Sequence, residues 1–260
     1  LCEMTTDWEI FQERDLSPEV WQYIKDHRFF GMIIPKEYNG LGFSATLHSH
    51  VIEKLVSRSQ VLAITVMVPN SLGPAELILK HGTQEQKDKY LARLAYGKEV
   101  PCFALTEPNA GSDATSIQSS GVLFKDKDEI KIRLNFEKRY ITLANIATLI
   151  GLAFQLKDPD GLLRNKADLG ITFALVKASL KGVDNSKRHD PLGIPFINSP
   201  LYGKDVIINL EDIIGAQDGI GKGWSMLVES LSIGRGISLP SVSLGGSKLA
   251  LKVVASYTQV

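Results

Sequence analysis

The chain has 260 residues, of which 44% are hydrophobic and 22% charged, with 29 basic and 29 acidic side chains. This balance disfavours nucleic-acid binding and anionic-membrane binding, which both favour a basic excess. The longest apolar runs fall short of the roughly 20 residues that a membrane-spanning helix needs. Cys2 and Cys102 are too few and too far apart for a disulfide framework or a zinc site. We therefore expect a globular, cytoplasmic protein without a metal.

Helix signals dominate the first hundred residues. Ser17 and Pro18 suit an N-cap and a first helical position, and Ser44 suits a second N-cap. A third helix is predicted to begin at Pro74 and end at Gly82. A fourth helix is predicted between a capping box of Thr83 and Gln86 and a stop at Gly97. The residues expected on buried faces are Val20, Tyr23, Ile24 and His27 in the first helix, Leu47, Val51 and Leu55 in the second, and Tyr90, Leu91 and Leu94 in the fourth.

The hydrophobic period changes from about residue 101. In "EIKIRLNFEKRYIT", residues 129 to 142, apolar and charged residues alternate, which is typical of a half-buried antiparallel strand. Further strand-like runs lie at 147–156, 169–178 and 204–210, and turn residues such as "KDPDG" separate them. These runs predict a compact β domain.

Helical spacing returns at Trp224, Leu227, Val228 and Leu231. We therefore predict an α+β multidomain fold: an N-terminal helical domain at 1–100, a middle antiparallel β-barrel domain at 101–214, and the start of a C-terminal helical bundle at 215–260. The chain opens without Met and ends in the helix-prone "GGSKLALKVVASYTQV", so we expect it to be part of a longer protein.

Three stretches carry weak signals for ligand chemistry. In "HSH", His48 and His50 do not share a helix face, so we expect no metal site there. "GIGKGW", residues 219 to 224, lacks the Walker spacing of a phosphate loop and is interpreted as a loop-to-helix turn. The basic segment 179–191 is either a solvated loop or a phosphate contact.

The stretch "LTEPNAGSD", residues 105 to 113, gathers hydroxyls, turn residues and carboxylates directly after the apolar "PCFA". One interpretation is a long surface turn, since five of these residues are turn formers. The other is a site where backbone N–H groups and hydroxyls hold a polar, phosphate-bearing ligand. The residues by themselves leave both open.

"LTEPNAGSD" closely resembles the "T-E-P-x-A-G-S-D" signature of the acyl-CoA dehydrogenase family. "EKRYITLA", residues 137 to 144, is similar to the family's "W-I-T-N" strand, with Leu143 in place of the Asn. "GMIIPKEYNGLGFS", "KHGTQEQKDKYLARLAYG" and "GIGKGW" resemble three further motifs in the family's order. The resemblance spans about residues 29–260 and is greatest to the large bacterial long-chain members with C-terminal extensions.

The resemblance implies an FAD site and an adjacent acyl-CoA site. In the family, the residue corresponding to Thr106 hydrogen-bonds the flavin ring, and the residue corresponding to Thr142 hydrogen-bonds it near N5. The residue corresponding to Ser112 lies between cofactor and substrate. The residue corresponding to Arg235 lies on the helix beside the substrate. Glu107 and Asp113 are interpreted as structural parts of the turn. The full set expected at the cofactor is Phe103, Leu105, Thr106, Gly111, Ser112, Tyr140, Ile141 and Thr142, and the set expected at the substrate is Ser112 and Arg235.

The implied reaction is flavin-dependent α,β-dehydrogenation of fatty acyl-CoA to trans-2-enoyl-CoA, with electrons passing to an electron-transfer flavoprotein. The catalytic glutamate is expected beyond residue 260, because its alternative position in the family corresponds to Gly234. We therefore expect the chain alone to be inactive and to hold FAD weakly or not at all. The full-length protein is expected to be a homo-oligomer, cytoplasmic in a bacterium, with any membrane association coming from other regions.

Two alternatives remain. An acyl-CoA oxidase would share the flavin and the base but pass its electrons to oxygen. A non-catalytic acyl-CoA-binding module would follow if the natural chain ended near residue 260.

Overall fold

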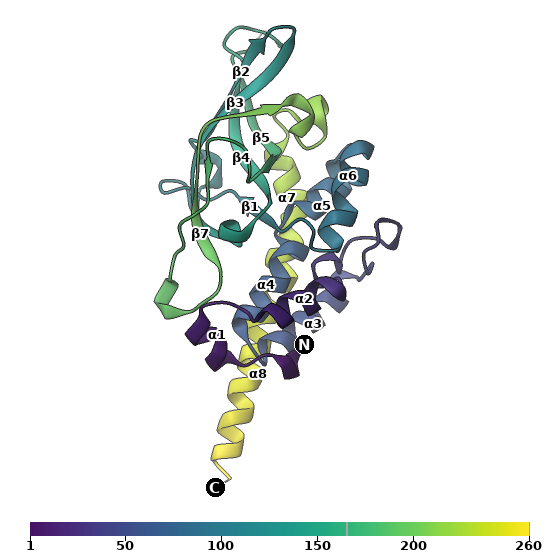
Figure 1. Ribbon diagram of the computed structural model, residues 1–260, viewed down its shortest axis with the longest axis vertical. Helices are drawn as coiled ribbons and strands as arrows, with labels where there is room; N and C mark the ends of the chain where they lie inside the picture. Colours follow the sequence, from purple (N-terminus) through teal and green to yellow (C-terminus); the bar gives the residue numbers. More distant parts are fainter. Residues whose placement is uncertain (165, 260) are drawn as a thin grey trace.

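The computed structural model describes residues 1–164 and 166–259, and the side chains of Ile233 and Arg235 lie outside the described part. Figure 1 shows a curled sheet at one end of an elongated molecule, helices packed beside and below it, and a last helix that projects at the other end. The helices are α1 (Asp7–Glu13), α2 (Pro18–Asp26), α3 (Ala45–Val56), α4 (Gln60–Ser71), α5 (Pro74–His81), α6 (Gln84–Ala95), α7 (Gly223–Ile233) and α8 (Leu239–Tyr257). The strands are β1 (Pro101–Ala104), β2 (Ser120–Asp126), β3 (Glu129–Thr142), β4 (Leu149–Lys157), β5 (Asp168–Lys177), β6 (Val183–Asp184) and β7 (Asn198–Asn209).

Local capping bonds begin the predicted helices. The Ser17 hydroxyl accepts from the Val20 N–H at the start of α2, and the Ser44 hydroxyl accepts from the Leu47 N–H at the start of α3. Thr83 and its capping-box partner begin α6 in the same way. The predicted starts of these helices are confirmed, because each depends on residues within four positions of one another.

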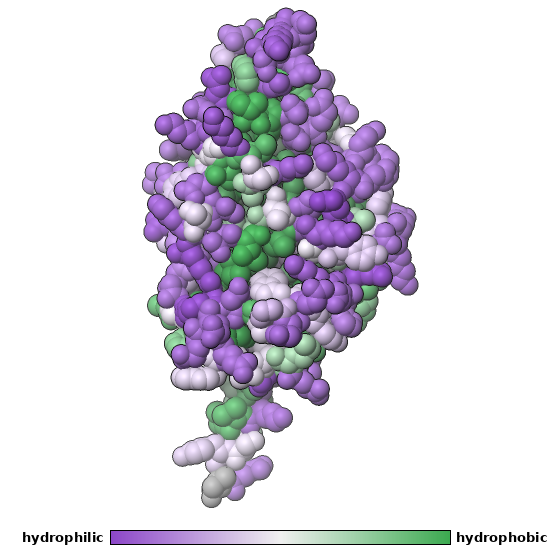
Figure 2. All heavy atoms as spheres, in the orientation of Figure 1, coloured by the Kyte–Doolittle hydropathy of each residue, from purple (hydrophilic) through white to green (hydrophobic). Residues whose placement is uncertain are grey.

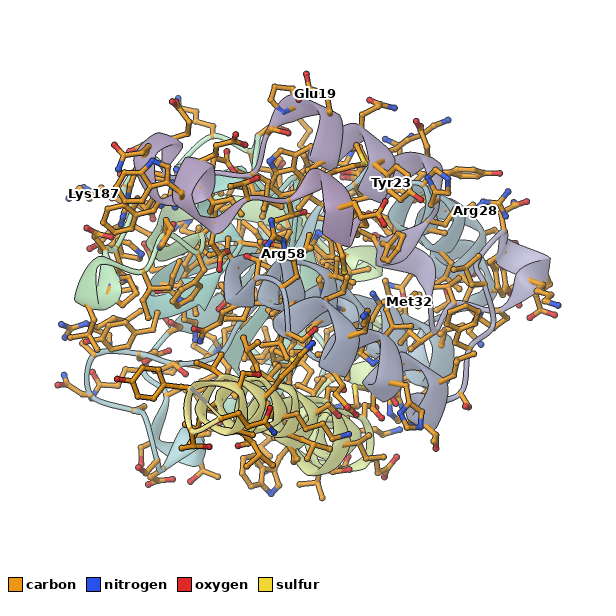
Figure 3. The ribbon with its side chains drawn as sticks, turned by 90° about the horizontal axis from the view of Figure 1, so that it is seen from below. Glu19, Tyr23, Arg28, Met32, Arg58 and Lys187 are labelled. Carbon is orange, nitrogen blue, oxygen red and sulfur yellow. The ribbon has the colours of Figure 1, made fainter. Side chains whose placement is uncertain are left out.

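The predicted buried face of α3 was correct at Leu55 and wrong at Leu47. Leu47 is 45% exposed, Val51 is half-buried, and the buried residues are His48, Ile52, Leu55 and Val56. The helix packs against α4 and α8, so these contacts decide which residues are covered. Figure 3 shows the yellow ribbon of α8 below the other helices. In α2 the prediction failed at its last residue, since His27 is exposed and stacks on the Tyr23 ring outside the core.

Helix α4 carries no periodic signal, and the sequence did not predict it. The stretch Gln60–His81, which contains α4 and α5, is apolar and long enough to pass for a membrane span, yet 89% of its most apolar window is buried inside the protein. A helix that is apolar on every side has no amphipathic period, because all of its faces contact neighbours. It forms the centre of the helical layer, as the position of α4 in Figure 1 also indicates.

The buried His48 on α3 predicts an acid-sensitive fold. Its ring is 1% exposed, its Nδ1 lies 3.4 Å from the Ser238 hydroxyl, and its Nε2 has no partner among the described residues. Burial lowers the pKa of His48 to about 4, and Glu76 and Lys80 line the same small cavity. Between pH 6.5 and 4 the unfolded histidine binds a proton that the folded one does not, so the fold loses stability as the pH falls.

We expect the free energy of unfolding to be about 2 kcal/mol lower at pH 5 than at pH 7 through His48 alone. Urea unfolding at the two pH values measures it, and His48→Gln should remove this part of the pH dependence. His50→Gln is the matched control, because His50 lies on the same helix with an exposed side chain. An unchanged pH dependence in His48→Gln would contradict the prediction.

The sheet confirms the predicted β domain and corrects its pairing. Its order is β1-β4-β2-β3-β7-β6, with β5 on the other side of β4. Most pairs are antiparallel, but β1 and β2 both run parallel to β4. Alternation in a sequence shows that a strand is half-buried and does not show its direction, so the expectation of an antiparallel sheet was wrong for these two pairs. Within the described residues, β5 and β6 are edges, and the sheet is curled rather than closed.

Strands β1 and β2 follow one continuous track along β4. Strand β1 pairs with residues 149–152, and β2 pairs with residues 155–157 in the same direction. The loop at 105–119, which holds "LTEPNAGSD", therefore interrupts what would otherwise be a single strand. It leaves the sheet after β1 and returns to it at β2.

The layers meet in a shared core. Leu77, Leu91 and their neighbours from α5 and α6 pack with Phe173 of β5 and with Leu227 and Leu231 of α7. Figure 2 shows apolar side chains gathered in a band down the middle of one face, with hydrophilic side chains to either side. The interface between helices and sheet is thus the place where a ligand cavity can form.

Candidate functional site

A cavity of about 430 Å³ lies where the helices meet the sheet. Its lining comes from four elements that are far apart in the sequence: Val68 and Leu72 of α4, Phe103, Leu105 and Thr106 at the end of β1, Tyr140, Ile141 and Thr142 at the end of β3, and Trp224, Leu227, Val228, Leu231 and Ser232 of α7. The volume lies within the range of small-molecule sites, about 300–1,000 Å³.

The lining combines apolar walls with several hydroxyls. Aromatic and aliphatic side chains make up most of it, and the hydroxyls belong to Thr106, Tyr140, Thr142 and Ser232. Such a cavity suits a flat, largely apolar ring system with polar atoms along one edge.

Strand β3 is irregular where it enters the cavity. Its register with β7 shifts directly before Ile141, and Tyr140 has a φ of +59°, in the left-handed region that bulky residues rarely adopt. The Arg139 N–H donates to the Thr106 carbonyl at 2.9 Å, and the Asn198 amide donates to the Tyr140 carbonyl at 3.0 Å. The bulge therefore joins the end of β3 to the loop after β1 and to β7.

A buried ion pair holds the 105–119 loop against β3. The Lys138 side chain is 0% exposed, and its Nζ lies 2.7 Å from Glu107 Oε1 and donates to the Leu105 carbonyl at 3.1 Å. The Glu107 carboxylate also accepts from the backbone N–H groups of Gln118 at 2.6 Å and Ser119 at 3.1 Å. Through Glu107, the start and the end of the 105–119 loop are both bound to Lys138 of β3.

Both members of the pair have displaced pKa values. Burial by itself raises the pKa of Glu107, but the hydrogen bonds from Lys138 and from the loop outweigh it and hold the pKa below its ordinary value. Burial lowers the pKa of Lys138 to about 8, against the opposing effect of the Glu107 carboxylate. At neutral pH both groups are charged, and the Glu107 carboxylate is occupied by Lys138 and by two backbone N–H groups of its own loop. The geometry is that of a structural ion pair.

Two consecutive family models match the chain. The N-terminal domain of acyl-CoA dehydrogenases matches residues 3–98, and the middle domain of acyl-CoA dehydrogenases matches residues 102–206. The chain belongs to the acyl-CoA dehydrogenase family.

Relatives of the chain include reductases as well as dehydrogenases. It is 32% identical over 99% of its length to the caffeyl-CoA reductase-Etf complex subunit CarC of Acetobacterium woodii, of which it covers 65%. Protein HemX of Proteus mirabilis is 52% identical over 38% of the chain and 58% of that protein. The chain therefore spans about three fifths of the length of these relatives.

Solved structures confirm the fold. Butyryl-CoA dehydrogenase from Megasphaera elsdenii superposes with a TM-score of 0.82 at 27% identity, over 96% of this chain and 62% of that one. The acyl-CoA dehydrogenase of Bacillus anthracis, solved in complex with FAD, gives a TM-score of 0.80 at 27% identity, over 96% of this chain and 40% of that one. Helical domain, curled sheet and the start of a second helical region match the family's architecture.

Six of the eight residues predicted at the cofactor line the cavity. The other two, Gly111 and Ser112, lie in the exposed part of the 105–119 loop, outside the lining. A Cβ built on Gly111 would meet no atom within 4 Å, so that position is open to solvent or to a ligand. In the same loop, the Asp113 carboxylate accepts from the Thr115 N–H and caps a short turn. Both predictions about Gly111 and Ser112 remain predictions.

One of the two residues predicted at the substrate, Arg235, lies at the junction of α7 and α8. Arg235 belongs to a π-helical turn, Gly234–Ser238, and its side chain lies outside the described residues. At Gly234 an added Cβ would come within 2.4 Å of the Ser71 carbonyl oxygen, so α4 leaves no room there for any side chain. The position cannot hold a catalytic carboxylate without movement of the backbone.

Sequence reasoning missed the contribution of α7 to the cavity. Trp224 and Val228 are 43% and 53% exposed, although helical spacing placed them on an apolar face. They line the cavity rather than the core. The available signal was the width of the apolar face of α7, which is wider than its contact with the sheet needs. Such a face does not distinguish residues that line a cavity from residues of the core.

Proposed function

We propose that this chain supplies the FAD site and part of the acyl-CoA site of an oxidoreductase that removes hydrogen across the α and β carbons of fatty acyl-CoA thioesters, as in fatty acid β-oxidation. The observation that carries the proposal is the meeting of the β1 end and the β3 bulge around one largely apolar cavity that both Thr106 and Thr142 line. A second candidate is reduction of a 2-enoyl thioester by the same groups, favoured by the similarity to the caffeyl-CoA reductase subunit.

The residues present fit a flavin. Phe103, Leu105 and Tyr140 supply flat or apolar surface, while Thr106 and Thr142 supply hydrogen-bonding groups from two separate segments. When bound, FAD would accept hydride from the β carbon of the substrate. The chain's own part is to hold the ring between the β3 bulge and α7, to exclude water with the apolar walls, and to donate a hydrogen bond from Thr142 near N5.

The partners follow from the same proposal. An electron-transfer flavoprotein is the expected acceptor, and the similarity to a subunit of an Etf complex supports it. Homo-oligomerisation of the whole protein is expected from the family resemblance. An acyl-CoA oxidase remains the rival if the reduced protein reacts rapidly with oxygen.

Titration of FAD with the chain tests the proposal. We expect weak but saturable quenching of flavin fluorescence, and about fivefold weaker binding in Thr142→Val, because one neutral hydrogen bond contributes about 1 kcal/mol. Thr46→Val is the matched control, since Thr46 is an exposed residue of α3 outside the cavity lining. A full-length protein that stays colourless after FAD is added, or an equal FAD affinity in Thr142→Val and Thr46→Val, would overturn the proposed flavin site.

A further inference from the structure

Asn198 of β7 lies opposite Thr142 of β3 and contacts it directly. The two residues are paired in the β3–β7 ladder, and Asn198 Nδ2 lies 3.3 Å from Thr142 Oγ1. The same Nδ2 lies 3.0 Å from the Tyr140 carbonyl oxygen. Asn198 Oδ1 lies 3.0 Å from Nδ1 of His189, whose backbone N–H donates to the Asn198 carbonyl at 2.7 Å. Asn198 is 5% exposed, so these contacts replace water almost completely.

The contacts fix which way the Asn198 amide faces. A backbone carbonyl can only accept, so the amide atom beside the Tyr140 carbonyl must be the NH₂ nitrogen. The amide oxygen then faces His189, which donates from Nδ1–H. Both hydrogens of the nitrogen are used, one by Tyr140 and one by Thr142, and every donor and acceptor of the amide has a partner.

This orientation of the amide decides that the Thr142 hydroxyl accepts from Asn198 rather than donates to it. Its oxygen accepts the hydrogen bond from Asn198, so its own hydrogen must point elsewhere. Thr142 lines the cavity, and the hydrogen bonds among the described residues include none that this hydroxyl donates. The O–H is therefore free to donate into the cavity.

We propose that Asn198 is a positioning residue that holds the Thr142 hydroxyl as a hydrogen-bond donor toward the flavin, a role that rests on the proposed function. A donating hydroxyl there would match N5 of the oxidised ring, which accepts, rather than N5 of the reduced ring, which carries the hydrogen gained as hydride and donates. Asn198 would thereby raise the affinity for oxidised FAD relative to reduced FAD without touching the cofactor. His189 completes the arrangement by fixing the amide.

Asn198→Asp tests the direction of the hydrogen bond to Thr142. The substitution keeps the shape of the side chain and replaces its NH₂ donor with a carboxylate oxygen, which accepts. The Thr142 hydroxyl would then donate to the carboxylate rather than into the cavity. We expect the ratio of the affinity for oxidised FAD to the affinity for reduced FAD to fall about fivefold, the effect of one neutral hydrogen bond. The double variant Thr142→Val/Asn198→Asp should show no larger loss than Thr142→Val alone. Additive losses, or an unchanged ratio in Asn198→Asp, would overturn the inference.

Asn198→Ala tests the positioning without any flavin. In the flavin-free chain, three-bond couplings to the Thr142 γ-methyl report one rotamer in the wild type, and we expect rotamer averaging in the variant. A rotamer unchanged in Asn198→Ala would overturn the inference even if FAD never binds. Absence of FAD binding by the wild type would instead count against the proposed function alone.

Asn185→Asp is the matched control for both measurements. The Asn185 side chain also binds a backbone carbonyl, that of Ala144 at 2.8 Å, and has no hydrogen bond to Thr142. It should leave the affinity ratio and the Thr142 rotamer as in the wild type. The thermal unfolding transition of each variant shows whether the chain is still folded. A change in the orientation of the Thr142 hydroxyl is thereby distinguished from loss of the fold.

Discussion

Lys138→Met is expected to lower the free energy of unfolding by about 3–5 kcal/mol at pH 7, because it leaves the Glu107 carboxylate buried without its cation. The lysine side chain is 0% exposed and the glutamate side chain 5% exposed, so water cannot replace the lost partner. Urea unfolding followed by circular dichroism measures the loss. Since the pair fixes the 105–119 loop to β3, any flavin affinity should fall as well.

Two comparisons make this test specific. Lys131→Met removes a lysine that pairs with Asp126 at 2.7 Å, but the Asp126 side chain is 45% exposed, and we expect a loss below about 1 kcal/mol. The double variant Glu107→Gln/Lys138→Met should recover part of the loss, because a neutral amide costs less to bury than an unpaired carboxylate. If Lys138→Met were no more destabilising than Lys131→Met, the hypothesis that the Lys138–Glu107 ion pair holds the 105–119 loop would be wrong.

The chain by itself is expected to show no acyl-CoA dehydrogenase turnover, even with excess FAD and an artificial electron acceptor. Among the described residues, no Asp or Glu lines the cavity, and Gly234 is pressed against the Ser71 carbonyl. Glu229 on α7 has a side chain that is 62% exposed and lies 3.7 Å from His81 Nε2, outside the cavity lining. Loss of a positioned base costs about 10²- to 10⁴-fold in rate.

Dye reduction with saturated acyl-CoA substrates of several chain lengths measures this turnover. Butyryl-CoA dehydrogenase from Megasphaera elsdenii, assayed with butyryl-CoA, is the positive control. Turnover by the chain at about 1 s⁻¹ or faster, a rate typical of enzymes, would show that the base lies within these residues. The proposed flavin site would survive that outcome, but the assignment of Gly234 would not.

The sequence by itself determined the elements whose signals are local. Ser17, Ser44 and Thr83 begin helices because a cap needs only the N–H groups two or three residues later. The stretch 129–142 coincides with β3, and its alternation holds through Ile132, Leu134 and Phe136, since a half-buried strand shows its two faces in consecutive residues. The resemblance of "LTEPNAGSD" and "EKRYIT" to family motifs identified two segments whose ends now line one cavity.

Only the tertiary structure decided which distant segments meet. The parallel track of β1 and β2 along β4, the burial of α4 on all sides and the α7 wall of the cavity depend on packing between elements, which no local period records. The clearest case is Asn198, which lies 56 residues after Thr142 in the sequence and beside it in the sheet. Register between β3 and β7 sets that contact, and register follows from the bulge at Tyr140 and from the side chains that fill the core on both strands.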